Sequence, residues 1–363
     1  MGKKVGILTF QDAHNYGASL QAYALKKYIT DLGYDAKIIN YHHQNLPYGS
    51  PREREIPEGA SQEEIEKIKY SEKDYLERYD KFEKVIDDLV DHEKEILRHE
   101  DDLAKLDIDF WVSGSDQIWN TDITVEMNKG YFLDFPTKGK KITYAVSMGK
   151  SKLEEKFETD FKRVLENIDH ISVREDALRD YAKSFTDKEV IRVVDPTLLL
   201  ERDSYNSLVK ENKIKEKYLL LYTLVSDERL IKIAKRIAEE KNLKIIELNE
   251  CKVKDSEFEQ VSNAGPEDFL TLIKNAEVIL SNSYHGTIFS IIFGKEFYTL
   301  PMKNRNARME TLLNILGMSD RFISCAEDLD KIGAQDYKKG YERLDKEVKL
   351  SREFLNKALK VEE

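Results

Sequence analysis

A histidine stands where an apolar strand pattern changes into an apolar helix pattern. Residues 278–280 are apolar on both faces, as in a strand of a parallel sheet, and residues 287–293 have the composition of a buried helix. His285 lies at the carboxyl end of that strand, where open α/β sheets bind ligands. Because histidine titrates near neutral pH, we expect His285 to serve as a general acid or base. A histidine that only caps the helix is the alternative.

The start of this helix also predicts an anion-binding site. Backbone amides at a helix N-terminus favour negative charge, and a glycine lets a ligand approach the chain closely. We therefore expect ligand contacts from the residues that flank the histidine. They are Ser283, Tyr284, Gly286 and Thr287.

Two polar clusters in the first half of the chain also follow predicted strands. In the first, Asn15-Tyr16-Gly17, small residues leave room for a ligand over a helix start, although Asn15 acting as a plain cap explains the same letters. The second is Ser115-Asp116-Gln117. There we expect Asp116 to hydrogen-bond a substrate hydroxyl or to orient a base, and a helix cap is again the alternative.

Cations supply the third kind of candidate. Arg174 follows a predicted strand, and its guanidinium fork suits a carboxylate or a phosphate, with an internal ion pair to Glu175 or Asp176 as the alternative. Lys303 and Arg308 belong to a basic stretch after another strand. The default interpretation of that stretch is solvated charge, and Arg308 is its candidate to face an anion. Asp195, which precedes a proline, is explained by a turn.

The elements that must position these residues alternate between strand and helix along most of the chain. This predicts an α/β protein with two doubly wound Rossmann-like domains that face a cleft. The first domain is expected at 1–205 and the second at 206–334, with a charged helix at 335–363 that packs back. Residues 59–106 depart from the alternation and predict a charged helical insertion, either a capping hairpin or an arm over a ligand.

Composition narrows the possible functions. The 363 residues carry a formal net charge of -11, which argues against a general nucleic-acid binder. We expect no signal peptide, no transmembrane segment and a cytoplasmic location, because no apolar run is long enough and Cys251 and Cys325 show no pairing pattern. No ligand cluster has metal-binding spacing, so we expect neither a metal nor a cofactor.

Taken together, the motifs resemble those of the polysaccharide pyruvyl transferase family, over about residues 4 to 321. The resemblance implies a fold similar to the GT-B glycosyltransferases. It also implies transfer of pyruvate from phosphoenolpyruvate onto two hydroxyls of a sugar, as a ketal. The matching motifs are Asn15-Tyr16-Gly17, Gly114-Ser115-Asp116-Gln117-Ile118-Trp119-Asn120, Ser172-Val173-Arg174-Glu175, Asp195-Pro196-Thr197, Tyr284-His285-Gly286 and Asn306-Ala307-Arg308.

By this resemblance His285 matches the histidine of the family's His-Gly motif, and Arg174 matches the arginine of its Ser-x-Arg segment. Many members carry an arginine two residues before the histidine, where this chain has Ser283. We expect Arg308 or Lys303 to supply that cation.

The implied mechanism gives each candidate a role. We expect His285 as the acid, Asp116 as the group that positions a hydroxyl, and Arg174 with the amides of Gly286 and Thr287 as the cradle for the phosphate. The predicted donor-binding residues are Arg174, Ser283, Tyr284, Gly286, Thr287, Lys303 and Arg308. The predicted acceptor-binding residues are Asn15, Tyr16, Gly17, Ser115 and Gln117.

The partners expected from this mechanism are phosphoenolpyruvate and a sugar or glycan acceptor, free or lipid-linked. Two other functions remain open at this point. One is a GT-B glycosyltransferase that uses a nucleotide sugar, and the other is a non-catalytic carbohydrate-binding protein.

Overall fold

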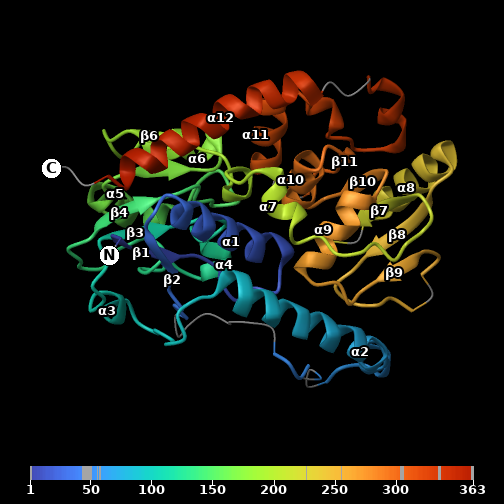
Figure 1. Cartoon of the computed structure of the whole chain (residues 1–363), viewed down its shortest axis with the longest axis horizontal. Helices are drawn as coiled ribbons and strands as arrows, with labels where there is room; N and C mark the ends of the chain where they lie inside the picture. The colour runs from blue at the N-terminus through green and yellow to red at the C-terminus, as the bar shows by residue number, and fades with distance from the viewer. Residues whose placement is uncertain are drawn as a thin grey trace.

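The fold is α/β and is built on parallel sheets (Figure 1). We refer to residues up to 205 as the N-terminal half and to later residues as the C-terminal half. The computed structural model describes residues 2–42, 51–54, 56, 59–225, 227–254, 256–302, 306–333 and 337–360.

The N-terminal half contains a four-stranded parallel sheet in the order β2-β1-β3-β4 and a two-stranded parallel sheet, β5-β6. Isolated bridges such as Ile142 to His170 connect the two. The strands are β1 (Lys4–Leu8), β2 (Asp35–Ile38), β3 (Phe110–Ser113), β4 (Lys140–Thr143), β5 (Ile171–Val173) and β6 (Val190–Arg192). All residues of β3 and β5 are buried, as expected for parallel strands covered on both faces.

The C-terminal half contains a five-stranded parallel sheet in the order β11-β10-β7-β8-β9. Its strands are β7 (Tyr218–Tyr222), β8 (Lys244–Leu248), β9 (Glu259–Val261), β10 (Val278–Ser281) and β11 (Glu296–Thr299). The fully buried β7 and β10 lie at the centre, where their apolar runs are covered on both faces.

Helices connect the strands. The α-helices are α1 (Tyr16–Asp31), α2 (Gln62–Val85), α3 (Glu100–Leu103), α4 (Thr121–Thr124), α5 (Glu158–Asn167), α6 (Asp176–Lys183), α7 (Arg202–Asn206), α8 (Glu228–Lys241), α9 (Pro266–Asn275), α10 (Tyr284–Ile292), α11 (Ala307–Leu316) and α12 (Tyr337–Ala358). The short helical turns are η1 (Ile86–Val90), η2 (Glu155–Phe157), η3 (Pro196–Leu198), η4 (Ser319–Arg321) and η5 (Ala326–Lys331). Within the described residues, no helix is both long and apolar enough to cross a bilayer.

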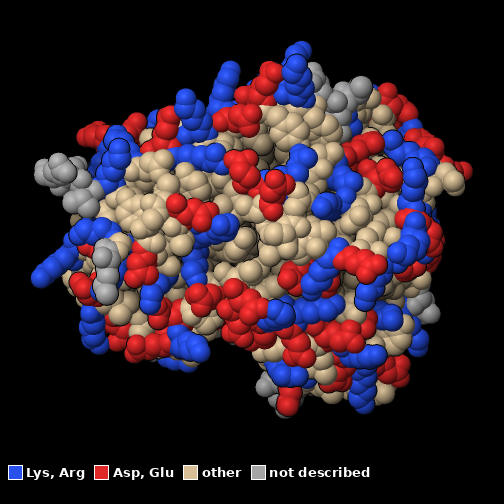
Figure 2. Space-filling model, viewed as in Figure 1, with Lys and Arg blue, Asp and Glu red and all other residues tan. Residues whose placement is uncertain are grey.

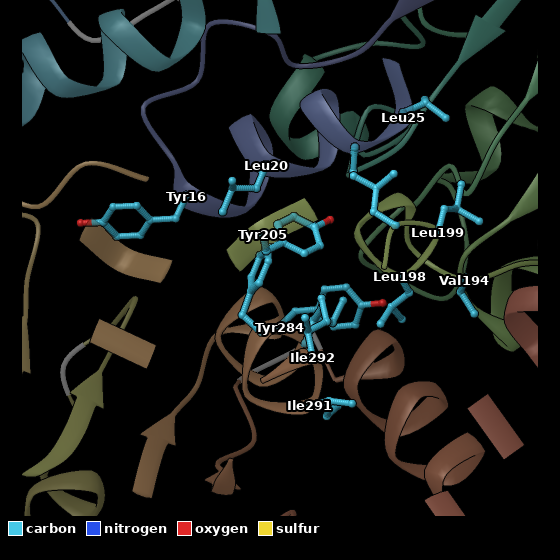
Figure 3. Packing of buried hydrophobic residues seen from close by; sticks show 14 of the residues in the cluster. Tyr16, Leu20, Leu25, Val194, Leu198, Leu199, Tyr205, Tyr284, Ile291 and Ile292 are labelled. Atoms are coloured by element: carbon cyan, nitrogen blue, oxygen red, sulfur yellow. The ribbon is translucent and has the colours of Figure 1, made fainter. Parts of the chain in front are cut away.

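A shared core joins the two halves. Tyr16 of α1 packs against Phe269 of α9, and residues of α7 and α10 belong to the same buried cluster. Figure 3 shows members of this cluster from both halves: Tyr16, Leu20 and Tyr205 from the N-terminal half and Tyr284 from the C-terminal half. The helix start that holds the candidate histidine therefore rests on residues from both halves.

The last helix returns to the N-terminal half, as expected from its charged, amphipathic pattern. In Figure 1, α12 runs from the C-terminal half back above the N-terminal half. The Ser351 Oγ accepts a hydrogen bond from the Val194 N–H, and the Tyr34 hydroxyl donates to the Leu359 carbonyl. The exact boundaries near residues 205 and 335 stay predictions.

The predicted insertion is helical over most of its first part. Ser61 and Glu64 form a capping box at the start of α2, which continues through η1 to Val90. The chain then leaves the helix until the short α3. On the face drawn in Figure 2, the described acidic and basic side chains are interleaved, and they form no broad basic surface of the kind that binds nucleic acid.

Candidate active site

A cavity of about 270 Å³ lies between the two halves at the carboxyl ends of their strands. The N-terminal half contributes the β1–α1 loop and the segment after β3, and the C-terminal half contributes the start of α10 and the start of α11. The polar lining residues are Asn15, Asp116, Gln117, Asn282, Ser283, Tyr284, His285, Asn306 and Arg308. The described part of the cavity wall is therefore polar around His285, the predicted acid, and Arg308, a predicted cation.

Ser283 sets the geometry of the α10 start. Its hydroxyl accepts from the Gly286 N–H at 3.2 Å, and its carbonyl accepts from the Thr287 N–H at 3.1 Å. These bonds fix the first turn, in which Tyr284 and His285 face the cavity. They also occupy the two amides that we expected in the phosphate cradle. In this conformation the capping bonds use both Gly286 and Thr287, so the cradle expected from them is not formed.

The His285 ring lies between a carboxylate and a glycine. Its Nε2 is 3.4 Å from Asp195 Oδ2, and a Cβ added to Gly17 would come within 1.9 Å of its Nδ1. The residue is only 7% exposed yet lines the cavity. Asp195 therefore orients the ring from one side, and only a glycine fits on the other.

Behind the histidine is a buried ionic cluster centred on Arg174. Its Nη1 donates to Asp195 Oδ2 at 2.6 Å, and its Nη2 donates to Asp116 Oδ1 at 3.3 Å. Its Nε is 3.8 Å from Glu175 Oε1. Arg174 is 2% exposed and is not among the residues that line the cavity. The structure thus places Arg174 one layer behind the cavity, where it pairs with carboxylates. The alternative to anion binding, an internal pair with Glu175, is the arrangement that the structure shows.

Arg308 is the described cation that reaches the cavity wall. Its guanidinium carbon is 5.3 Å from the centre of the Tyr284 ring, and that of Arg174 is 4.9 Å from the same ring. Arg308 Nη1 is 3.7 Å from Asp116 Oδ1, too far for a normal hydrogen bond. Arg308 therefore has donor capacity left for a ligand anion. Lys303, the other cation proposed for this role, lies outside the described residues.

Burial and charge act against each other on the acids of this cluster. Burial alone would raise the pKa of Asp195, but the charges of His285 and Arg174 and the hydrogen bond from Thr197 lower that pKa well below its usual range. The pKa of Asp116 is likewise lowered, because Arg174, His285 and Arg308 outweigh its burial. For Glu175 burial prevails, and its pKa is raised.

The pKa of Arg308 is lowered, whereas pairing with a carboxylate raises the pKa of an arginine. Burial lowers it first, and the charge of Arg174 lowers it further. Asp116 and Glu175 offset this only in part. An anion bound at Arg308 would relieve an unfavourable charge environment.

The predicted acceptor residues divide into two groups. Asn15 and Gln117 line the cavity, and Asn15 also caps α1 by accepting from the Gly17 and Ala18 amides. Tyr16 and Ser115 are buried away from it: the Tyr16 hydroxyl donates to the Ala264 carbonyl and Ser115 Oγ donates to the Ala145 carbonyl. For these two the structure corrects the expectation, because their side chains hold the fold together. Gly17 contributes space beside His285.

Asp195 is the site residue that sequence reasoning did not select. Its turn explained its presence, and the turn is real: Oδ1 accepts from the Thr197 amide and hydroxyl. The other oxygen, Oδ2, faces both Arg174 and His285. Its position at the end of a predicted strand was the available signal. Among the described residues, no group of three or more His, Cys, Asp or Glu side chains is arranged to hold a metal ion.

These features define a two-lobed α/β protein of GT-B-like architecture with a histidine and an arginine in its cleft. The structure of S. aureus MnaA with UDP matches with a TM-score of 0.51 and 12% identity, covering 95% of this chain and 91% of that one. A UDP-N-acetylglucosamine 2-epimerase structure matches with a TM-score of 0.54 and 11% identity, covering 99% and 96%. At these identities the likeness shows the fold alone.

The family is shown by sequence. A family model described as polysaccharide pyruvyl transferase matches residues 15–304, and the chain belongs to that family. No curated protein matches the chain. The matched range includes Gly17, Asp116, Arg174, Asp195 and His285.

Proposed function

We propose that the protein transfers the pyruvyl group of phosphoenolpyruvate onto two hydroxyls of a sugar in a cell-surface polysaccharide or its precursor. The product is a pyruvate ketal, and the other product is phosphate. The observation that carries this proposal is a cavity-lining histidine, His285, held by a buried carboxylate and facing the same cavity as Arg308. Family membership supports the same reaction class.

The reaction needs one proton at carbon. Protonation of the methylene carbon of the donor gives a methyl group and leaves cationic character on the carbon that bears the phosphate. A sugar hydroxyl adds there and loses its proton. Phosphate then leaves with its bonding electron pair, and the second hydroxyl closes the ketal and loses its proton. Of the two hydroxyl protons, one balances the proton given to carbon and the other leaves with phosphate.

His285 is the acid in this scheme. With Nε2 directed at Asp195, the nitrogen that gives the proton is Nδ1, next to Gly17. The Asp195 carboxylate, 3.4 Å from Nε2, keeps the ring in this orientation. Asp195 is therefore a positioning residue, because it acts through the histidine.

Arg308 takes the donor anion. It lines the cavity, its Nε has no hydrogen-bond partner among the described residues, and it supplies the charge that Ser283 does not. Arg174 supports this seat indirectly, since it holds Asp116 and Asp195 in place from behind. Fixed guanidinium donors of this kind stabilise phosphate and carboxylate charge without reorganisation during the reaction.

Asp116 positions the acceptor hydroxyl. Its lowered pKa keeps it ionised, so it accepts a hydrogen bond from a hydroxyl at neutral pH. Asn15 and Gln117 lie on the same wall and provide further polar contacts for a sugar, free or lipid-linked. No metal and no cofactor enter this scheme. We assign it to the cytoplasm, which suits the free thiols of Cys251 and Cys325.

Calorimetric titration tests the donor. Phosphoenolpyruvate should bind the wild type, and Arg308→Ala should weaken that binding by roughly 10-fold or more, the scale for losing a charge-assisted bond. Arg98→Ala removes an exposed arginine that does not line the cavity. It is the matched control and should bind phosphoenolpyruvate normally. Binding of a nucleotide sugar without binding of phosphoenolpyruvate would contradict the proposal and favour a glycosyltransferase.

A further inference from the structure

The insertion helix α2 is hydrogen-bonded to the β1–α1 loop, which forms one wall of the cavity. Arg78 Nη2 donates to the carbonyl of His14 at 2.7 Å, and the Arg78 side chain is 4% exposed. Its guanidinium carbon lies 4.6 Å from the centre of the Phe82 ring. A buried guanidinium bonded to a loop carbonyl fixes that carbonyl in position, because breaking the bond would leave buried polar groups unsatisfied. Arg78 Nη2 is also 3.7 Å from Glu250 Oε1 of the C-terminal half.

The same loop residue is held through its side chain. His14 Nε2 is 2.8 Å from Glu83 Oε1, and its ring stacks on Phe82 with centroids 5.1 Å apart. Its neighbours Ala13 and Asn15 line the cavity, and Gly17, three residues on, backs His285. Holding His14 therefore fixes the residues that shape this wall.

The same side of α2 is also attached to the C-terminal half, at the loop between β9 and α9 and at the start of α9. Lys81 Nζ donates to the Asn263 carbonyl and pairs with Asp268, each at 2.8 Å. Glu77 and Asp74, about one and two turns earlier, accept from Asn263 and Ser262 at 2.6 and 2.5 Å. Positions 74, 77 and 81 lie along one helix face, as their spacing requires. Figure 1 shows α2 running beneath both halves.

We propose that α2 is a positioning element, with Arg78 as its main positioning residue, that sets the β1–α1 loop against the C-terminal half and so aligns the two walls of the cavity. The catalytic part of this inference rests on the proposed function. The loop belongs to one half and His285 to the other, so their alignment requires a link between the halves. Helix α2 contacts the C-terminal half through polar side chains, and it contacts the loop through a hydrogen bond that is buried.

Two variants loosen the two attachments of α2, and Arg78→Ala also removes the 3.7 Å ion pair with Glu250 of the C-terminal half. Arg78→Ala releases the loop, and the double variant Asp74→Ala/Lys81→Ala releases the C-terminal half. Lys69→Ala, at an exposed lysine of the same helix, is the matched control. Arg78→Lys keeps a donor for the His14 carbonyl and tests rescue.

Hydrogen–deuterium exchange of residues 10–17 and steady-state kinetics are measured for each variant. Arg78→Ala should speed exchange in residues 10–17 by roughly 5-fold or more, with the native fold retained. It should lower kcat by roughly 10-fold, since small misplacements of reacting groups have large effects on rate. Phosphoenolpyruvate affinity should change by less than about threefold, and Arg78→Lys should recover part of kcat. The double variant should lower kcat in the same way, and Lys69→Ala should match the wild type.

Unchanged exchange in residues 10–17 of Arg78→Ala would overturn the inference, and so would faster exchange with an unchanged kcat. Exchange needs no substrate. If the wild type releases no phosphate from phosphoenolpyruvate, the proposed function fails, while the exchange result still decides whether α2 holds the loop.

Discussion

Two strand-to-helix junctions, β1–α1 and β10–α10, are built from nearly the same local parts and end up with different tasks. Each begins with a polar cap whose side-chain oxygen accepts a helix amide, Asn15 from Gly17 at 3.0 Å and Ser283 from Gly286 at 3.2 Å. In each the next residue is a tyrosine. Tyr16 is stacked on Phe269 in the shared core, whereas Tyr284 lies against two guanidiniums at the cavity.

The residue after each tyrosine explains the difference. At the first junction it is Gly17 and at the second it is His285, and these two residues contact each other across the cleft. One junction provides room and the other provides a titratable group. Local capping signals therefore predict a helix start, and the surroundings of that start decide whether it does chemistry.

The largest expected effect is at the second junction. His285→Ala should lower turnover by roughly 100-fold or more, the usual scale for losing a general acid, because the variant lacks the imidazole that is proposed to give the proton. Phosphate release in the presence of acceptor measures it. His99→Ala, at an exposed histidine, should retain activity. Equal turnover of the wild type and His285→Ala would remove this residue from the mechanism.

Asp195 contacts the histidine of the second junction, and its replacement should lower the stability of the protein. Asp195→Asn should lower the free energy of unfolding by about 3 kcal/mol at pH 7, since it leaves Arg174 with one carboxylate fewer in a buried site. The folded pKa of Asp195 is lowered, so its contribution is present above about pH 4 and is lost as pH falls further.

Urea unfolding between pH 3 and 7 checks the Asp195 prediction. The wild type should lose stability more steeply below pH 4 than Asp195→Asn does. Asp160→Asn, whose side chain is 60% exposed, should change stability by less than about 1 kcal/mol. Parallel pH curves for the wild type and Asp195→Asn would contradict the assignment.

The contact between the junctions predicts a third effect. In Gly17→Ala the new methyl group would lie 1.9 Å from His285 Nδ1, so the ring must move. We expect kcat/KM to fall by roughly 10-fold or more, because the acid is displaced from its substrate. Gly333→Ala, where an added Cβ meets nothing within 4 Å, is the control. Normal kinetics in Gly17→Ala would mean that the ring position is unimportant.

At Tyr284 a smaller effect is expected. Tyr284→Leu removes the ring that both guanidiniums face and should weaken phosphoenolpyruvate binding by roughly 3- to 30-fold, while Tyr284→Phe keeps the ring and should bind normally. Calorimetry distinguishes the two. Equal affinity of the leucine and phenylalanine variants would exclude a role for the ring face.

The smallest effect is at the first junction, where the matching tyrosine is structural. Tyr16→Phe should lower the free energy of unfolding by about 1 kcal/mol, because the Ala264 carbonyl loses its buried donor. Turnover should stay within about twofold of the wild type. A large loss of turnover with unchanged stability would return Tyr16 to the acceptor site.

Much of this arrangement is predictable from sequence, because it depends on local patterns. The buried runs of β7 and β10, the helix start at Asn15 and the charged insertion have the expected period or cap. Helix α10 begins at Tyr284, three residues before the expected start at Thr287. Strand β9 was not predicted, since its residues are polar and partly exposed at the sheet edge. Asp116, which has a left-handed backbone at φ 68°, also gave no sign of that conformation in sequence.

The sequence pattern could not predict side-chain partners that are far apart in the sequence. Arg174 looked like a ligand contact, but its bonds go to Asp195 and Asp116, 21 and 58 residues away. Tyr16 looked like part of an acceptor motif, but its hydroxyl reaches a carbonyl 248 residues away. Such pairings depend on how the two halves meet.

Acceptor-dependent phosphate release tests the central claim most directly. The purified protein is incubated with phosphoenolpyruvate and pooled glycans, free and lipid-linked, and free phosphate is followed over time beside His285→Ala. The account predicts that wild-type protein releases phosphate only when an acceptor is present and that the variant releases at most a hundredth as much. Phosphate release that does not depend on acceptor, or that is equal in the variant, would contradict it.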